Sequence, residues 1–530
     1  MIHQIQLIFV LLLLFIVGFG VLAQRLKTPY PIVLVIGGLA LSFVPRLPRV
    51  ALDPNFIFLA VLPPLLFSAA ALTSWRDFQY NLISILSLAF GLVGFTVVGV
   101  SLAAHMLIPY FDWRLGLVLG ATVAPTDAIA ATAIAQRVGL PQRIVDILEG
   151  ESLVNDATGL LALEFSTALV VSGHIPTVTG GILRLLYLVA GGIGIGLLTG
   201  KIVHVIESHL SNPPIEITVS IITPFVAYMS AEALRSSGVL AAVAAGLYLG
   251  RKISYAFSPW VRIEATSFWN TLTFLLNGIV FLLIGLQLPY ILHGIRLVTL
   301  RELFTSAAEL AGAVVLLRLI WVFPAAYVGD FIRRRLLHRQ ERPMSARGVF
   351  IVGWTGMRGV VSLAAAIAVP ARIANGEPFP ERSELIFLTF SVILVTLVLQ
   401  GLTLPSLIRA LKLSGAHQQN SEERRARHAM LQAALKYVEE LRSQDEPEFE
   451  PVYDTLAEMY GQRLAALRDS DNEGRHPRAD QSAHFREIAG KLREVERSTL
   501  IGMRNRKEIG DHVLRKIERE LDLLDTRYAE

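Results

Sequence analysis

The chain has 530 residues, of which 53% are apolar and 17% charged, and its mean hydropathy is +0.53. A protein with so few charges cannot cover that much apolar surface in water. The composition therefore excludes a soluble protein and predicts that most of the chain is surrounded by lipid. The net charge of +4 does not indicate a nucleic-acid partner, because the basic residues are spread over short loops and the C-terminal part rather than gathered in one patch.

The first apolar run, Ile5 to Ala23, is long enough to cross a bilayer. Its end, Val21-Leu22-Ala23, looks like a weak signal-peptidase site. However, Met1 to Gln4 carries no Lys or Arg, and Arg25 and Lys27 follow the run immediately. We therefore expect a retained first helix, with a cleaved signal as the alternative.

Apolar runs of this kind recur along the chain, and each span needs about 20 apolar residues. We expect about thirteen spans, at 5–23, 29–45, 55–73, 81–108, 114–134, 144–172, 182–206, 215–233, 237–250, 267–290, 305–329, 348–370 and 384–411. The eighth and ninth are the least distinct, since only Leu234 to Ser236 separates them. The pattern predicts an all-α polytopic membrane protein.

Basic residues in short loops predict the orientation of such a protein. They follow the first, ninth and eleventh spans, at Arg25, Lys27, Arg251, Lys252, Arg262, Arg333, Arg334, Arg335, Arg339, Arg342 and Arg347. All three loops follow odd-numbered spans, so they share one side of the membrane, which is then cytoplasmic. The N-terminus is expected outside and the C-terminal tail inside.

From about residue 414 the composition changes, which predicts a transmembrane domain at 1–413 and a charged, helical cytoplasmic tail at 414–530. Within the tail, apolar residues repeat at helical spacing at Leu431, Leu435 and Val438, and again at Ile509, Val513, Ile517, Leu521 and Leu524. Residues 469–483 have the composition of a flexible linker. A tail that stabilises the protein or a dimer is the first interpretation, and a regulatory tail is the alternative.

The fifth span contains a proline next to polar residues, in the run Gly120 to Asp127. Pro125 removes a backbone donor and clashes with the preceding turn, so it should open the helix near the middle of the membrane. An opened helix is tolerated there only where it is buried in protein or lines a cavity. Thr126 and Asp127 lie at this break, where they could cap the second half of the helix, line a transport site, or do both.

The sixth span carries four polar side chains on neighbouring positions, Glu151, Ser152, Asn155 and Asp156. Spacings of four residues place Ser152 beside Asp156, and Glu151 beside Asn155, on the helix surface. A hydroxyl, a carboxylate and an amide together form a hard oxygen site that suits Na⁺, K⁺ or Li⁺ rather than a transition metal. A carboxylate buried for structure alone is the alternative.

Two arginines also lie in apolar spans. Arg318 must find an anion or water, and Glu151 is the expected partner because either charge buried alone would be very unfavourable. Arg358 lies in the glycine-interrupted twelfth span, with an arginine that snorkels to the interface as its alternative interpretation. Two interrupted spans in corresponding positions indicate a transporter built from inverted repeats.

At these residues the sequence resembles the monovalent cation/proton antiporters of the sodium/proton exchanger type. The resemblance rests on Gly120 to Leu161, with A-P-T-D and G-E-S-L-V-N-D, on Leu62 to Phe67, and on Gly356 to Val361. It covers about residues 5–411, and the charged tail fits bacterial members. It implies a multi-pass protein of the bacterial inner membrane that exchanges Na⁺, or Li⁺ or K⁺, for H⁺.

The resemblance also implies an architecture and a set of site residues. The fold would comprise two inverted six-helix repeats with broken, crossed helices, assembled as a homodimer. Asp156 would carry the cation and the proton in turn, with Ser152, Thr126 and Asp127 as further Na⁺ ligands. Asn155 before Asp156 is similar to the electroneutral branch, and Arg318 matches the position that neutralises an acidic residue. No cofactor and no nucleic acid are implied.

One position departs from the pattern of some prokaryotic relatives, which carry a glutamate just after the run that ends at Phe67. Here that residue is Ser68, which puts the number of cation ligands and the Na⁺ or K⁺ preference in question. The alternatives to a Na⁺/H⁺ antiporter are a K⁺/H⁺ antiporter of the same fold, a cation channel and a transporter-like sensor. No nucleophile triad, metal-ligand cluster or phosphate-binding loop indicates an enzyme.

Overall fold

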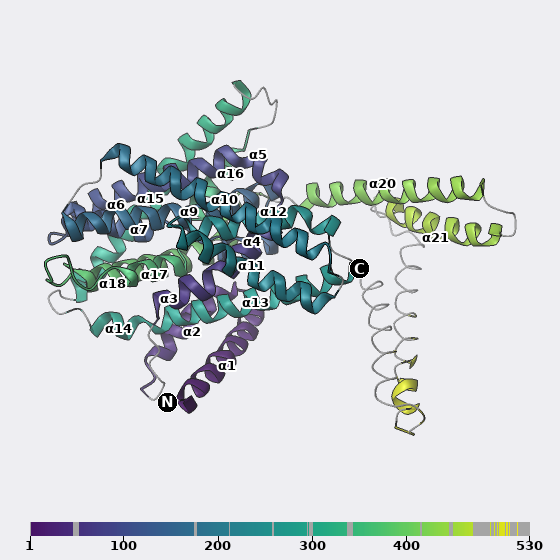
Figure 1. Ribbon diagram of the computed structural model, residues 1–530, viewed down its shortest axis with the longest axis horizontal. Coiled ribbons are helices and arrows are strands. Elements are labelled where there is room, and N and C mark those ends of the chain that lie inside the picture. Colours follow the sequence, from purple (N-terminus) through teal and green to yellow (C-terminus); the bar gives the residue numbers. More distant parts are fainter. Residues whose placement is uncertain are drawn as a thin grey trace. The chain divides into compact units, whose positions relative to one another are not determined.

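The computed structural model describes residues 2–45, 52–173, 177–210, 212–256, 259–293, 295, 300–335, 343–413, 416–444 and 449–469, with scattered positions between 488 and 517. The described chain is built from helices (Figure 1). It falls into two compact units, residues 1–416 and residues 417–530.

The helices of the first unit follow one another with short connections. Their bounds are α1 Ile2–Leu26, α2 Tyr30–Ser42, α3 Pro54–Phe56, the π-helical turn η1 Ile57–Val61, α4 Leu62–Leu72, α5 Trp75–Leu86, η2 Ser87–Leu92, α6 Val93–Leu107, α7 Trp113–Val123, α8 Ile129–Val138, α9 Gln142–Ser172, α10 Val178–Glu207, α11 Pro213–Ala233, α12 Gly238–Ala256, α13 Pro259–Leu286, α14 Leu288–His293, α15 Leu300–Arg335, α16 Ala346–Trp354, α17 Val360–Ala368, α18 Arg382–Val395, η3 Thr396–Gln400 and α19 Gly401–Ala410.

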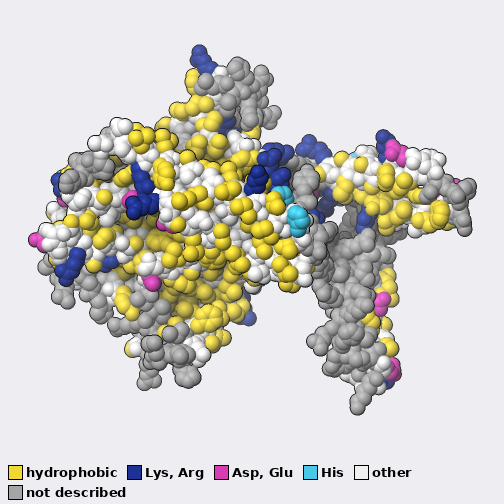
Figure 2. Space-filling view, viewed as in Figure 1, with side chains coloured by type: hydrophobic (Ala, Val, Ile, Leu, Met, Phe, Trp, Pro, Cys, Tyr) yellow, Lys and Arg dark blue, Asp and Glu magenta, His cyan; other side chains and the backbone are white. Residues whose placement is uncertain are grey.

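Helical structure lies at every segment where the sequence predicts a span. Within the described chain, nine helical stretches are long and apolar enough to cross a membrane, and two shorter apolar helices are α2 and α7. The surface agrees with this length argument, because hydrophobic side chains cover much of the visible face of the first unit (Figure 2). The chain is therefore an all-helical, multi-pass membrane protein.

Several predicted spans have the wrong ends, and in two of them polar terminal turns were counted as loops. The fourth was expected from residue 81, but α5 begins at Trp75, where the Ser74 hydroxyl accepts a hydrogen bond from the Asp77 amide (3.4 Å). The eleventh was expected to end at 329, but α15 continues to Arg335. The arginines at its end lie in the last helical turn, where positive charge complements the helix dipole.

Glycines allow helices of the first unit to approach closely. A Cβ at Gly250 would lie 2.2 Å from the Ala71 carbonyl oxygen, and one at Gly246 would lie 2.5 Å from the Phe67 carbonyl oxygen. Helix α12 therefore packs backbone to backbone on α4. On another side of the unit, Ile85 of α5 packs on Gly150 of α9, where a Cβ would lie 2.4 Å from Ile85 Cδ1.

The fifth and twelfth predicted spans are each interrupted. Helix α7 ends at Val123 and α8 begins at Ile129, while α16 ends at Trp354 and α17 begins at Val360. The two interruptions touch, since the Asp127 amide donates to the Met357 carbonyl oxygen at 2.8 Å. Backbone groups freed by each break thus find partners in the other, which a break inside a membrane requires.

In the second unit, α20 (Ala416–Arg442) and α21 (Glu450–Asp469) are amphipathic helices. Leu431 and Val438 of α20 are buried, so the predicted helical spacing gives a shared apolar face. Arg442 forms ion pairs with Glu450 (2.7 Å) and Asp454 (3.2 Å) of α21. The predicted linker at 469–483 and the repeat at 509–524 lie almost wholly outside the described residues.

Candidate ion-binding site

A cavity of about 240 Å³ lies where α4, α9 and α13 meet the two helix breaks. Its polar lining combines residues expected from the sequence with others, namely Ser68, Thr126, Asp127, Thr132, Glu149, Ser152, Asp156, Thr273, Asn277 and Ser362. The predicted residues Pro125, Thr126, Asp127, Ser152 and Asp156 all line it. Asn155, Glu151, Arg318 and Arg358 lie beside it rather than in its lining.

Asp156 is the most deeply buried of the three carboxylates that line this cavity. Its side chain is 6% exposed, yet its carboxylate forms no hydrogen bond or ion pair with the described residues. The carboxylate of Asp127 is close enough to interact with it electrostatically. Asp127, Asp156 and Glu149 thus bring three carboxylates to the lining of a small cavity. A buried carboxylate in such surroundings needs a cation or a proton.

The amide groups at the start of α8 hold Asp127 and Ser152 in place. The Ile129 amide donates to Asp127 Oδ1 (2.8 Å), and the Ala128 amide donates to Ser152 Oγ (3.3 Å). Asp127 thus caps the second half of the broken helix and lines the cavity at the same time. The hydroxyl hydrogen of Ser152 and the second oxygen of Asp127 have no partner among these contacts.

Gly359 makes room for Asp127 at the second break. A Cβ on Gly359 would lie 2.1 Å from Asp127 Oδ2, closer than any real contact allows. The carboxylate therefore lies directly against the backbone that starts α17. The positive end of that helix dipole contributes to holding the negative charge of Asp127.

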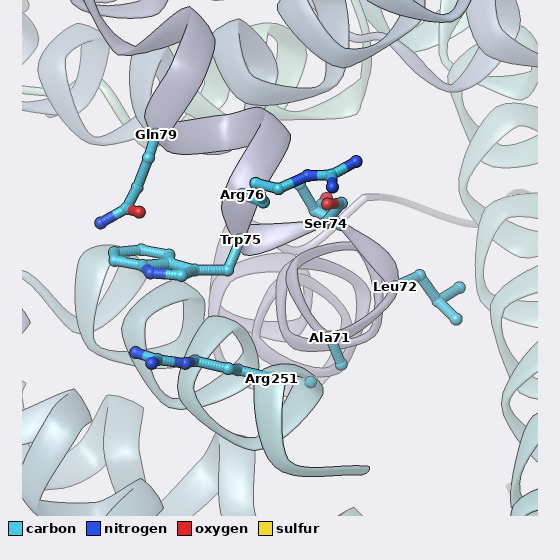
Figure 3. A pocket seen from close by; sticks show the side chains of 9 residues that line it. Ala71, Leu72, Ser74, Trp75, Arg76, Gln79 and Arg251 are labelled. Carbon is cyan, nitrogen blue, oxygen red and sulfur yellow. The ribbon is translucent and has the colours of Figure 1, made fainter. Parts of the chain in front are cut away.

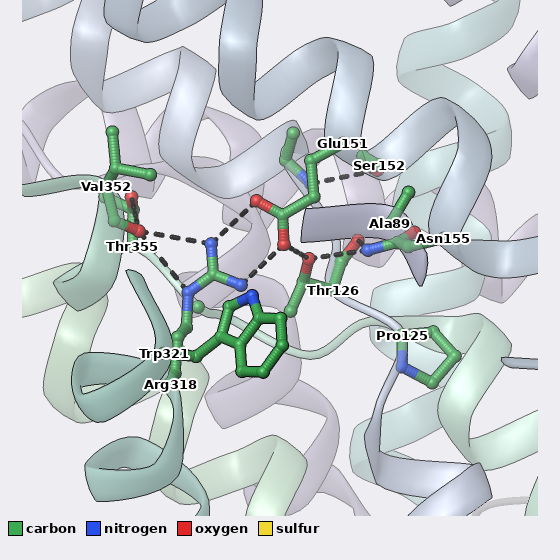
Figure 4. A network of polar contacts seen from close by, with 12 residues as sticks. Ala89, Pro125, Thr126, Glu151, Ser152, Asn155, Arg318, Trp321, Val352 and Thr355 are labelled. Atoms are coloured by element: carbon green, nitrogen blue, oxygen red, sulfur yellow. Dashed lines mark hydrogen bonds and ion pairs between the residues drawn. The ribbon is translucent and has the colours of Figure 1, made fainter. Parts of the chain in front are cut away.

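Beside the cavity, four side chains form a buried polar network (Figure 4). Arg318 donates two bonds to Glu151, with Nη1 to Oε1 at 2.5 Å and Nη2 to Oε2 at 2.8 Å. The Thr126 hydroxyl donates to Glu151 Oε1 (2.8 Å) and accepts from Asn155 Nδ2 (2.7 Å). Arg318 and Glu151 are 0% and 1% exposed, so both charges of the pair are buried. Glu151 is thus the partner that the sequence predicts for Arg318.

At each break, a buried arginine donates a hydrogen bond to a carbonyl group near the C-terminal end of the half-helix that precedes the break. Arg318 donates to the Val352 carbonyl oxygen of α16 (Nη2, 3.1 Å), and Arg358 Nε donates to the Val123 carbonyl oxygen of α7 (2.9 Å). Arg358 donates in addition to the Gly356 carbonyl oxygen. Its side chain is 1% exposed, so the alternative in which Arg358 snorkels to the interface is wrong. Positive charge at these helix ends is favourable.

Part of the cavity lining comes from residues that the sequence motifs do not indicate. Thr273 and Asn277 of α13 face the cavity from one side of that helix, four residues apart. Polar residues at that spacing inside an apolar span were a usable signal. Glu149 of α9 is half-buried and also lines the cavity. Glu149, Ser152 and Asp156 follow one another at spacings of three and four residues on one face of α9, which could have indicated this.

The chain matches the transmembrane domain of the sodium/hydrogen exchanger family over residues 10–410. It is 31% identical over 527 residues to the uncharacterized Na⁺/H⁺ exchanger YjcE of Escherichia coli, covering 95% of each chain. The Na⁺/H⁺ antiporter ApNhaP of Aphanothece halophytica is 31% identical, with 78% of this chain and 75% of that one covered. The sodium proton antiporter MjNhaP1 of Methanocaldococcus jannaschii has a similar fold, with a TM-score of 0.59 at 22% identity over 77% of this chain and 99% of that one. The chain therefore belongs to the sodium/hydrogen exchanger family, and it is a monovalent cation/proton antiporter rather than an enzyme.

Proposed function

We propose that this antiporter exchanges Na⁺ for H⁺ and that both ions bind in turn at Asp156. The observation that carries the proposal is a contrast between two carboxylates on one helix. Glu151 is neutralised by Arg318, whereas Asp156, five residues further along α9, lies unpaired at a cavity. A buried ion pair is a structural element, but a buried unpaired carboxylate is an ion-binding group.

The cation would be surrounded by oxygen atoms of Asp156, Asp127, Ser152 and Thr126, directly or through water. These are hard ligands of the kind that alkali cations prefer. Thr126 would offer the lone pair that its two hydrogen bonds leave free. Asn155 would support the site without binding the cation, because its amide group donates to the Thr126 hydroxyl and positions it.

Competition for one carboxylate provides the coupling. Burial disfavours the charged form of a carboxyl group, so Asp156 would hold either a proton or a dehydrated cation. If only the loaded site can reorient across the membrane, each cation moved one way requires protons moved the other way. Because Asn155, rather than a second aspartate, precedes Asp156, we propose electroneutral exchange by alternating access.

For the whole protein, we propose thirteen spans in two inverted six-helix repeats, in which α7–α8 and α16–α17 are the equivalent broken helices. The matching arrangement of an arginine at each break supports this pairing. We further propose a homodimer in the bacterial inner membrane, with residues 1–413 as the exchange domain. Residues 414–530 would form a cytoplasmic tail, as the basic loops indicate.

The proposal also concerns which alkali cation the protein transports. One relative, from Bacillus pumilus, is named a sodium, potassium, lithium and rubidium/H⁺ antiporter, at 31% identity over 79% of this chain and 64% of that one. That breadth, together with Ser68 at the cavity in place of a carboxylate, supports K⁺/H⁺ exchange as the second candidate.

The test is proton flux in sealed proteoliposomes with an imposed pH gradient, to which Na⁺, Li⁺ and K⁺ are added in turn. Wild type should dissipate the gradient on addition of the transported cation, and Asp156→Asn should fold and give no response. Asn has the shape of Asp but neither releases a proton nor attracts a cation strongly. Exchange that persists in Asp156→Asn would reject Asp156 as the carrier, and the order of the three ions decides between the two candidates.

A further inference from the structure

An open pocket of about 600 Å³, separate from the ion cavity, lies where α4 ends and α5 begins (Figure 3). It is lined by Ala71, Leu72, Thr73, Ser74, Trp75, Arg76, Gln79, Gly250 and Arg251. None of these residues lines the ion cavity except Leu72. The proposed exchange mechanism therefore leaves this pocket unexplained.

The pocket has an excess of positive charge. Arg76 is on α5 and Arg251 on α12, and the lining contains no acidic residue. Arg76 Nε lies 3.7 Å from Asp77 Oδ1, outside the pocket lining, and the Arg76 side chain is 87% exposed. Arg251 forms no ion pair with any described residue. Ser74, Trp75 and Gln79 add hydroxyl, indole and amide groups from the start of α5.

This arrangement lies at the end of two membrane-spanning stretches, Pro54–Leu72 and the one that begins at Trp75. Tryptophan is typical of the membrane–water interface, and Leu72 at the pocket rim is 68% exposed. Guanidinium groups bind phosphate oxygens well, and basic pockets between spans are suited to anionic headgroups. An interfacial pocket with apolar and basic walls is therefore complementary to a phospholipid rather than to a soluble anion.

We infer that this pocket binds the phosphate headgroup of an anionic phospholipid at its basic wall, to which Arg76 and Arg251 contribute, with the acyl chains running along Leu72. The two arginines lie on different helices. Arg251 lies on α12, which packs on α4, whereas Arg76 lies on α5, which packs on α9. A headgroup bound by both arginines would join α12 to α5, the helix that packs on α9 at Gly150.

The test measures binding and does not depend on exchange. The full chain in neutral detergent is titrated with phosphatidylglycerol, with phosphatidylcholine and with inorganic phosphate, while bound lipid is counted by native mass spectrometry and melting temperature is recorded. Phosphatidylglycerol should bind and raise the melting temperature at concentrations where phosphatidylcholine and phosphate do not. Because the contact is electrostatic and near water, rising salt should weaken it.

Variants locate the site. Arg251→Gln and Arg76→Gln should each weaken phosphatidylglycerol binding about tenfold, a loss expected when one charge-assisted pair is removed. Arg114→Gln is the matched control, because Arg114 also follows a tryptophan at the start of a helix but lies over the Trp113 ring, 4.0 Å from Asp112, outside the pocket. All three arginines are on the surface, so lipid-free melting temperatures should remain unchanged.

Two results would overturn the inference. Equal phosphatidylglycerol binding by wild type and both pocket variants would place the lipid elsewhere. An equal response to inorganic phosphate would make the pocket a site for soluble anions. Arg251→Lys supplies a further check, because the retained charge should restore part of the binding that Arg251→Gln loses.

Discussion

The pairing of Glu151 with Arg318 leads to a prediction about single and double substitutions. Each charge is buried, so Glu151→Gln or Arg318→Gln alone leaves the other charge uncompensated, which costs about 3–5 kcal/mol in stability. The double variant Glu151→Gln/Arg318→Gln should recover part of that loss. Thermal unfolding of the four proteins checks this, and strictly additive losses would contradict a direct interaction. Arg347→Gln, at an exposed arginine, serves as the control.

Gly359 leads to a second prediction at the scale of one residue. The Cβ introduced by Gly359→Ala would overlap Asp127 Oδ2, so the carboxylate must move away from the cavity. We expect exchange to fall about tenfold or more, because displacing a binding group by about 1 Å is enough for a loss of that size. Gly194→Ala is the control, since nothing lies within 4 Å of its added carbon. Equal exchange by both variants would show that the position of Asp127 is unimportant.

At the scale of the helix, the interruption of α7–α8 depends on Arg358 as much as on Pro125. Pro125 opens the helix, but the carbonyl freed at Val123 must be bonded inside the membrane. Arg358→Met keeps the bulk and removes the donors, so it should lower the melting temperature by several degrees and stop exchange. Arg358→Lys should retain some stability through one donor, and full exchange in Arg358→Met would contradict the assigned contact.

The same helices show what the sequence could and could not predict. Apolar length located the spans, and Pro125 with the glycines near Arg358 located the two interruptions, because these signals are local. The contact between Asp127 and Met357 could not be predicted from the sequence, because the spacing of apolar residues does not indicate which helix breaks lie against each other. The bond from Arg358 to Val123 and the lining supplied by α13 depend on the same three-dimensional placement. The Glu151–Arg318 pair was accessible because two isolated buried charges of opposite sign need each other.

At the scale of the whole molecule, the two compact units predict the effect of removing the tail. Residues 1–416 contain the complete cavity and its supporting network. A protein that ends at Ala416 should therefore fold, insert and exchange cations with an unchanged order of ion preference. Flux of the shortened protein in proteoliposomes checks this, alongside the full chain at the same protein-to-lipid ratio. A changed cation order, rather than a changed rate, would contradict confinement of the site to the first unit.

Competition at Asp156 predicts how the entire transport cycle responds to pH. If a proton and a cation share one carboxylate, protons act as competitive inhibitors of cation binding. While the site is mostly protonated, the cation concentration that gives half-maximal flux should fall about tenfold for each unit rise in pH, and the maximal rate should stay constant, as mass action requires. Flux measured over a range of cation concentrations at several symmetrical pH values tests this. Separate sites for proton and cation would instead change the maximal rate at a constant half-saturating concentration. Glu149→Gln is the informative companion variant, because Glu149 lines the same cavity. If Asp156 alone carries both ions, that variant keeps the slope of about one decade per pH unit that single-site mass action gives.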